Sequence, residues 1–492
     1  MKHTPIRLVA CSLLVLIVLG SASAAKLSLR DPIRLPEGQA LKAVYCFPHW
    51  WEPWKSDDAA VANDFKKMKE IGFNTVCLDH EVSQAVDRDF FWLDREYKLA
   101  NQEKMYILPW LQLQSVDRSA LMKFSHLTLK AAVNQDKQPV EDCVIFGDSE
   151  FKKALVHYVT VYLDRYVDDP GLLRIKDGDK ARPVVGIMLE AGWRDPAGLP
   201  LSFDDDTNAY FRKWMKATYY DLKQLNKKWG TTYKSFDEID PCDKAVFNYN
   251  FTDRANPPLA IREHSLFRAR VIREVMLDVA KQIRKRHKNV LFVVEVAYPF
   301  DSQDPNADAY RWNNANEPQA TEFADVVFVR MLKGPTYTQG AQSLDKVLGA
   351  RRVVLAYRLT DDSKPAEVVN LALDCAMHSN GFAYYNWNEA ADTASALYDK
   401  PERQNAVKIF TGTYDVLNDY DTLRDAAIAA TAPAIPEVVQ PAANTEPAPA
   451  LAPAVVTPPA PAPEEVPAPV TVPPAPVPAP ETPAPAPEAP VK

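Results

Sequence analysis

Hydrophobic residues follow two alternating patterns along most of this chain: short continuous apolar runs, and longer stretches with apolar residues on one helical face. The short runs are typical of parallel strands that are covered on both faces. They predict eight strands, at residues 41–47, 75–78, 105–111, 184–189, 290–296, 326–330, 353–357 and 382–385. The amphipathic stretches predict helices at residues 59–70, 91–102, 151–166, 208–228, 262–288, 343–348, 365–379 and 402–418.

Eight strand–helix units in strict alternation predict an α/β fold of the (β/α)8 TIM-barrel type. The alternative is a doubly wound open sheet, which usually has fewer strands and a glycine-rich phosphate loop. No G-x-G-x-x-G motif occurs in the sequence, which favours the closed barrel.

The predicted units differ in length because three of the connections are long. Residues 112–149 follow the third strand, residues 191–207 follow the fourth strand, and residues 229–261 follow the fourth helix. The first two leave the carboxyl ends of strands, which is the face where barrel enzymes place their active sites. Loops of this length usually carry function or are disordered, so we expect both to wall a cleft.

The first 24 residues have the layout of a signal peptide. Lys2 and Arg7 precede an apolar run from Leu8 to Leu19, and Ala22-Ser23-Ala24 follows as a cleavage site. Leu8-Val9-Ala10-Cys11 also resembles a lipid-attachment site, but the apolar run continues past Cys11. We therefore expect cleavage near Ala24 and export to the periplasm or the extracellular space.

The body of the protein is predicted to span residues 25–425, followed by a disordered tail at 426–492. From Pro433 onward the chain is almost entirely Pro, Ala, Val, Glu and Thr, without aromatic residues. Such a segment buries too little apolar surface to offset its ordering entropy, and its prolines favour an extended chain. We expect it to act as a spacer or tether that can contact the cell envelope.

Charge and cysteine content exclude several classes of function. The net charge of −8 argues against a nucleic-acid partner, which needs a concentrated basic face. No stretch after the signal peptide is apolar enough to span a membrane. The later cysteines are odd in number and lack metal-ligand spacing, so we expect neither a metal nor a cofactor. Cys46 and Cys77 lie in predicted buried strands. The sequence leaves open whether any two of the five later cysteines form a disulfide.

Candidate functional residues are those just beyond each predicted strand, because these side chains converge on one pocket. Carboxylates and amides there can bond sugar hydroxyls, and aromatic rings can stack on the C–H faces of a pyranose. We predict substrate-binding roles for Trp50, Trp51, Asp79, Trp110, Trp193, Tyr298, Arg358, Asn386, Trp387 and Glu389. Strand 6 also offers Arg330. An oligosaccharide or polysaccharide is the expected partner.

Each of these candidates also has a purely structural explanation. A single tryptophan in the segment that contains Trp50 and Trp51 can simply pack in the core. Three tryptophans within five residues, however, favour a cleft. Asp79-His80-Glu81 can be a solvated turn, and no second histidine lies near His80 to complete a metal site. Residues 386–389 can cap the last helix.

Glu190 is the strongest catalytic candidate. It directly follows the apolar strand Val-Val-Gly-Ile-Met-Leu, which would place its carboxyl at the rim. Burial there would raise its pKa toward that of a general acid. The alternative is a structural ion pair.

From the fourth unit onward the sequence resembles glycoside hydrolase family 42, the β-galactosidase type. The resemblance rests on Val184–Glu190, Phe211-Arg-Lys-Trp214, Leu225-Asn-Lys-Lys-Trp-Gly-Thr231 and Phe236-Asp-Glu-Ile-Asp-Pro241, and it covers about Val184 to Val296. It implies a TIM barrel and a glycosidase that uses two glutamates, one after strand 4 as acid/base and one after strand 7 as nucleophile.

The two catalytic positions depart from that family pattern. Glu190 is preceded by Leu189, and Ala191-Gly192 occupy the positions that align with the family's Asn-Glu. Strand 7 ends in Tyr357-Arg358-Leu-Thr-Asp361, without a glutamate. Glu295 on strand 5 is our candidate for the second catalytic carboxylate, with Asp361 as the runner-up. Otherwise the mechanism is inverting, or catalysis has been lost.

These observations favour an exported glycoside hydrolase whose Glu190 and Glu295 cleave a carbohydrate in a cleft lined by carboxylates and aromatic rings. The alternative is an inactive carbohydrate-binding barrel displayed by the flexible tail, which the missing strand-7 glutamate favours. A barrel hydrolase that acts on something other than sugar is a third reading.

Overall fold

The structure is a computed structural model of the whole chain. It describes residues 29–47, 54, 57–86, 89–112, 118–188, 200–249, 258–298, 321–331, 351–359, 363–388 and 396–431. The predicted signal peptide, the tail beyond residue 431 and the predicted helix at 343–348 lie outside these residues.

A closed barrel of parallel strands forms the centre of the fold. Its eight described strands are β1 (Lys42–Cys46), β2 (Thr75–His80), β3 (Tyr106–Gln112), β7 (Lys180–Met188), β8 (Leu291–Tyr298), β9 (Val326–Met331), β10 (Arg352–Tyr357) and β11 (Phe382–Tyr384). Neighbouring strands pair in chain order, β3 pairs with β7, and β1 pairs with β11. The ring therefore closes, which confirms the predicted TIM barrel and excludes the open sheet.

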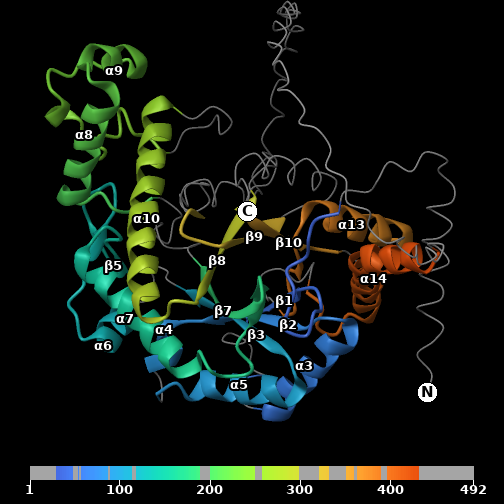
Figure 1. Ribbon diagram of the computed structural model, residues 1–492. Coiled ribbons are helices and arrows are strands. Elements are labelled where there is room, and N and C mark those ends of the chain that lie inside the picture. The colour runs from blue at the N-terminus through green and yellow to red at the C-terminus, as the bar shows by residue number, and fades with distance from the viewer. Residues whose placement is uncertain are drawn as a thin grey trace, which may run out of the picture. The chain divides into compact units, whose positions relative to one another are not determined.

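Helices surround this barrel in Figure 1. They are α3 (Asp58–Ile71), α4 (Val82–Val86), α5 (Phe91–Glu103), α6 (Arg118–Ser125), α7 (Ser149–Tyr166), α8 (Asp205–Tyr219), α9 (Leu222–Trp229), α10 (Leu259–Arg286), α13 (Pro365–His378) and α14 (Pro401–Thr431). Local chemistry sets their ends. The Asp57 carboxylate accepts a hydrogen bond from the Ala59 amide at the start of α3, and Gly72 ends that helix at φ 112°.

The single helix predicted at 208–228 is wrong, because α8 and α9 are separate. Tyr220 adopts φ 52°, outside the helical region, and the Asp221 carboxylate then caps the new helix by accepting from the Lys223 amide. An N-cap side chain competes with continued helix at that position. Figure 1 shows α8 and α9 beside α10 and away from the barrel strands.

Two additional pieces of sheet also lie outside the predicted units. The insertion after β3 contains α6 and the antiparallel hairpin of β4 (Ala131–Val133) and β5 (Pro139–Val144). Strand β6 (Arg174–Asp177) pairs antiparallel with the start of β7. The short η2 turn (Phe236–Glu238) follows α9.

The strands alternate between two hydrophobic cores. On β1, Ala43 and Tyr45 belong to the cluster inside the barrel, whereas Val44 and Cys46 belong to the cluster between strands and helices. Cys46 and Cys77 are fully or almost fully buried, as predicted, and no disulfide joins the cysteines in the described part of the chain.

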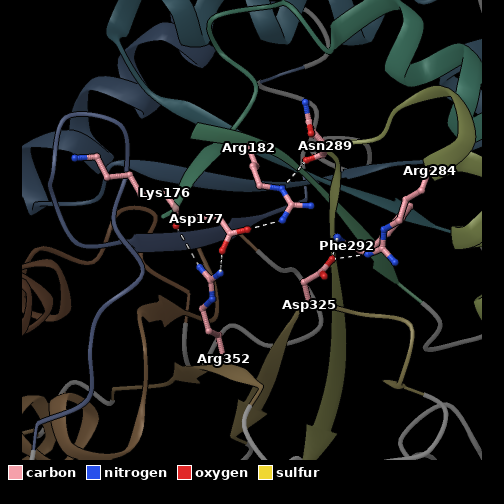
Figure 2. Close-up of polar contacts among 8 residues, drawn as sticks. All are labelled: Lys176, Asp177, Arg182, Arg284, Asn289, Phe292, Asp325 and Arg352. Carbon is pink, nitrogen blue, oxygen red and sulfur yellow. Dashed lines mark hydrogen bonds and ion pairs between the residues drawn. The ribbon is translucent and has the colours of Figure 1, made fainter. Parts of the chain in front are cut away.

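The amino-terminal end of the barrel is closed by a plug. Ile33, Leu35, Leu173 and Ile175 join the inner core, and the Lys176 amide donates to the Arg34 carbonyl. Figure 2 shows Asp177 between Arg182 of β7 and Arg352 of β10. The Arg352 guanidinium donates to Asp177 Oδ1 at 2.7 Å, which ties β6 to β10, a strand four places away in the sheet order.

Glycine at position 186 permits the packing of the inner core. Gly186 pairs with Trp110 across β3 and β7. A Cβ atom at Gly186 would lie 2.5 Å from Trp110 Cε3 and 2.8 Å from the Pro109 carbonyl oxygen. The Trp110 indole therefore occupies the space that a side chain at position 186 of β7 would fill.

We predict that Gly186→Ala lowers the free energy of unfolding by about 1–3 kcal/mol, the usual cost of overpacking a core. Gly412→Ala is the control, because a Cβ on this α14 residue meets no atom within 4 Å. It should stabilise by about 0.5–1 kcal/mol through the lower backbone entropy of the unfolded chain. Urea unfolding of both variants measures the effects, and an unchanged Gly186→Ala midpoint would contradict this packing.

A buried histidine makes stability depend on pH. His264 on α10 is fully buried among Phe203, Phe211 and Phe247, and its Nδ1 hydrogen-bonds the Tyr249 hydroxyl. Burial, and then the Arg268 guanidinium, lower the pKa of His264 well below its ordinary value of 6.5. The folded protein therefore binds this proton more weakly than the unfolded chain does.

Stability from His264 is fully present above pH 6.5 and is lost as pH falls toward the lowered folded pKa. We predict that His264→Gln, which keeps an acceptor for Tyr249 but does not titrate, removes up to about 1.4 kcal/mol per pH unit of the decline. Chemical unfolding at several pH values between 5 and 7 measures the slopes. His157→Gln, at an exposed position on α7, is the control and should keep the wild-type slope.

Candidate active site

A buried ion pair lies inside the barrel, toward the carboxyl ends of the strands. Glu295 of β8 and Arg330 of β9 are 5% and 4% exposed, and Arg330 Nε lies 3.3 Å from Glu295 Oε1. Arg330 is beside Ala297 in the strand register, one inward-facing position beyond Glu295. A carboxylate at this depth is stabilised in its charged form by the adjacent guanidinium.

Tyr45 of β1 also lies near Glu295. Burial raises the pKa of the Tyr45 hydroxyl well above its usual value, and the nearby Glu295 carboxylate raises it further. The ring is fully buried and stacks on Trp110 of β3, with centroids 5.9 Å apart. Tyr45 is therefore a neutral phenol held rigidly beside the carboxylate.

A second tyrosine links Arg330 to the end of β11. Arg330 Nη1 donates to the Tyr385 hydroxyl at 2.9 Å, and both side chains are buried. The Arg330 and Arg358 guanidinium carbons lie 4.8 Å and 4.6 Å from the Tyr385 ring centroid. Phe47 packs edge-on against the same ring at 5.8 Å. Arg358, a predicted binding residue, is partly exposed where β10 ends.

Asp79 is inside strand β2 and is 1% exposed. Burial, followed by the charges of Glu81 and Glu96, raises the pKa of the Asp79 carboxyl well above its usual value. His80 is also buried, with Nδ1 2.7 Å from the Tyr162 hydroxyl and Nε2 3.0 Å from Glu96. The solvated-turn interpretation of residues 79–81 is therefore wrong for Asp79 and His80.

Three other predicted binding residues are deeply buried. Trp110 is 1% exposed in the inner core, and Trp387 and Asn386 are fully buried. Trp387 belongs to the outer core, and its indole lies at the Asp64 carboxylate, which also accepts from Trp54 Nε1 at 2.8 Å. Neither tryptophan presents an exposed ring face in this conformation, and the Asn386 amide is buried as well.

The turn after β11 joins this strand to β1. The side-chain oxygen of Asn388 accepts from the Phe47 amide at 2.9 Å, and its nitrogen donates to the Phe47 carbonyl at 3.2 Å. This bridge fixes the mutual position of two strand ends at the mouth.

Several predicted residues lie outside the described part of the chain. These are Trp50, Trp51, Glu190, Trp193, Asp361 and Glu389, and the side chain of Tyr298 is likewise not described. The structure thus brings Glu295 together with Arg330, Tyr45, Tyr385 and Arg358, and leaves the position of Glu190 as a prediction.

Tyr45 and Tyr385 were missed as site residues. Both lie within predicted strands, whereas the prediction considered mainly residues beyond strand ends. The available signal was the two-residue alternation: Tyr45 shares the inward face with Ala43, and Tyr385 shares it with Ala383. A polar aromatic residue on the inward face near a carboxyl end is a site candidate.

The described residues contain no group of three or more His, Cys, Asp or Glu that could hold a metal ion. Within the same residues, no helix is long and apolar enough to span a bilayer.

Comparison with known proteins supports the resemblance seen in the sequence motifs. The model of glycoside hydrolase family 42, described as beta-galactosidase, matches residues 200–332. A curated relative, the beta-galactosidase Bga of Halorubrum lacusprofundi, is 25% identical over 222 residues. That match covers 40% of this chain and 27% of the relative, so the chain matches only about a quarter of that protein.

Solved structures share the fold. A beta-galactosidase from the psychrophilic Marinomonas ef1 matches with a TM-score of 0.52 and 15% identity, over 79% of this chain and 60% of that one. The catalytic domain of beta-amylase from Paenibacillus polymyxa matches with a TM-score of 0.55 and 10% identity, over 76% and 98%. At these identities the matches establish the TIM barrel alone, because one barrel fold supports many reactions. The chain is glycoside hydrolase family 42-like, as the motifs predicted.

Proposed function

We propose that this protein is a glycoside hydrolase that cleaves a galactoside within an oligosaccharide or polysaccharide at the carboxyl-terminal mouth of its barrel. The observation that carries the proposal is the buried carboxylate of Glu295, which lies 3.3 Å from the Arg330 guanidinium at the end of the barrel where such enzymes act. The similarity to β-galactosidases supports the substrate class.

Glycosidic cleavage needs two carboxyl groups with different protonation states. We assign Glu190 as the general acid that protonates the departing oxygen. Glu295, kept ionised by its guanidinium partner, is then the nucleophile or the base that activates water. Glu190 follows β7 by two residues, and β7 pairs with β8, which carries Glu295. Adjacent strands are a suitable origin for two groups that flank one bond.

Non-catalytic carbohydrate binding is the second candidate function. One observation favours it: β10 ends at Tyr357 and is followed by Arg358, where the family resemblance implies a glutamate nucleophile. A guanidinium cannot attack an anomeric carbon. It can donate hydrogen bonds to sugar oxygens, which suits a binding protein as well as an enzyme.

We also propose that residues 1–24 direct export and are removed. Amino-terminal sequencing of the protein recovered from outside the cytoplasm should begin near Ala25. Retention of Met1 in the cytoplasmic fraction would refute export.

We predict that Glu190→Gln and Glu295→Gln each reduce kcat for nitrophenyl β-D-galactopyranoside by about 10²–10⁴-fold, the usual contribution of a catalytic proton-transfer or nucleophilic group. Glu70→Gln is the control, because Glu70 lies exposed on α3. Thermal unfolding of all three confirms that they are folded. If wild type binds galactosides in calorimetry but cleaves none, the binding-barrel function replaces the hydrolase.

We further predict that the two carboxylates can be distinguished by trapping and stereochemistry. A retaining enzyme releases the anomer of the substrate's configuration first, which ¹H NMR detects. A 2-deoxy-2-fluoro galactosyl fluoride should then label Glu295 covalently, as read by peptide mass spectrometry. An inverted product with no label makes Glu295 the base. Labelling of Asp361 would show that Glu295 is the wrong residue.

A further inference from the structure

The Glu295–Arg330 pair belongs to a connected group that crosses four strands. Arg330 contacts Glu295 on β8 at 3.3 Å and donates to Tyr385, beyond β11, at 2.9 Å. Its guanidinium also lies over the Tyr385 ring. Arg330 is thus held between the carboxylate and the tyrosine, and its side chain has little freedom to rotate away.

Burial makes this arrangement consequential for charge. The side chains of Arg330 and Glu295 are 5% and 2% exposed, so water screens their interaction poorly. An isolated carboxylate at that depth would favour its protonated form, because desolvation penalises charge. A cation at 3.3 Å opposes that desolvation cost, because it favours the charged form of the carboxyl.

Other titratable groups surround the same carboxylate in the described interior. Tyr45 of β1 and Cys77 of β2 interact with it electrostatically, and burial raises the pKa of both, so they are neutral at pH 7. Arg358 of β10 lies at the Tyr385 ring, which separates it in the chain of contacts from Glu295. Among the described residues, Arg330 is thus a cation in direct contact with the carboxylate.

We infer that Arg330 is a positioning residue that orients Glu295 and keeps it ionised for reaction, and that Tyr385 holds Arg330 in place for this role. The inference rests on the proposed function, in which Glu295 acts as nucleophile or base. It goes beyond that function because it assigns control of the ionisation state of Glu295 to Arg330 on the neighbouring strand β9 and to Tyr385.

The first test is the pH dependence of kcat/KM with nitrophenyl β-D-galactopyranoside. Arg330→Met removes the cation and should raise the midpoint pH of the acidic limb by about one to three units, because an ion-pair partner lowers a carboxyl pKa by that amount. Arg330→Lys keeps the charge and should shift the limb less. Tyr385→Phe removes only the hydroxyl that accepts from Arg330, and should produce a smaller shift with a lower kcat.

If Arg330 had a purely structural role, replacing it would reduce the folded fraction without moving the midpoint of the acidic limb. If folded Arg330→Met and Arg330→Lys both keep the wild-type limb, the inference is overturned. Should Arg330→Met fail to fold, Arg330→Lys and Tyr385→Phe decide the question by the same profile.

The second test does not require activity. In urea unfolding, Arg330→Met should lower the midpoint because it leaves a buried carboxylate without its cation, and adding Glu295→Gln should restore part of the loss. The exposed pair Arg273–Glu322 is the matched control and should show little restoration. If wild type cleaves no sugar, the proposed function fails and with it the catalytic part of the inference, whereas this cycle still decides whether Arg330 controls the Glu295 carboxylate. Restoration supports control of Glu295 by Arg330, and its absence overturns it.

Discussion

Closure of the strand ring is the constraint on which the rest of the molecule depends. Pairing of β3 with β7 and of β1 with β11 leaves no open edge in the parallel sheet, so every second side chain must point into a space bounded on all sides. Apolar side chains fill the middle of that space, and the plug of Ile33, Leu35, Leu173 and Ile175 closes the amino-terminal end. Polar inward groups then accumulate at the other end.

The same closure forces tight packing beneath the polar groups. Trp110, Tyr45 and Phe328 contact one another inside the ring, and Gly186 makes room for the indole. This rigid aromatic layer supports Glu295 and Arg330. Because removing one member of a buried ion pair commonly costs about 3–5 kcal/mol, the pair cannot be altered at one end without a large penalty. Site geometry and fold stability are therefore coupled.

The strands could be predicted because burial on both faces leaves a local trace, a continuous run of apolar residues. All eight barrel strands lie within a few residues of their predicted positions. The break between α8 and α9 left a weaker trace, since it depends on the backbone of Tyr220 and the cap at Asp221. Hairpin β4–β5 and strand β6 are short and half exposed, so their residues show no continuous apolar pattern.

The candidate site was less predictable because contact across a barrel is not encoded locally. Tyr45 lies more than 200 residues before Arg330 and Tyr385, which are themselves 55 residues apart, and only the barrel brings all three to Glu295. The aromatic residues Trp110 and Trp387 show that a position at a strand end does not by itself imply an exposed ring. Their positions at strand ends suggested ring faces for sugar, yet one fills the inner core and the other the outer core.

Net charge is an equally indirect guide to the site. The chain carries a formal charge of −8, yet two guanidinium groups, those of Arg330 and Arg358, lie at the Tyr385 ring in the described mouth, and Arg330 also contacts the Glu295 carboxylate. Asp79 contributes little negative charge there, because burial raises the pKa of its carboxyl. A low-dielectric interior responds to its nearest charges and not to the distant surface. The ionisation of Glu295 is consequently set by Arg330, a residue whose role no composition or spacing along the chain could reveal.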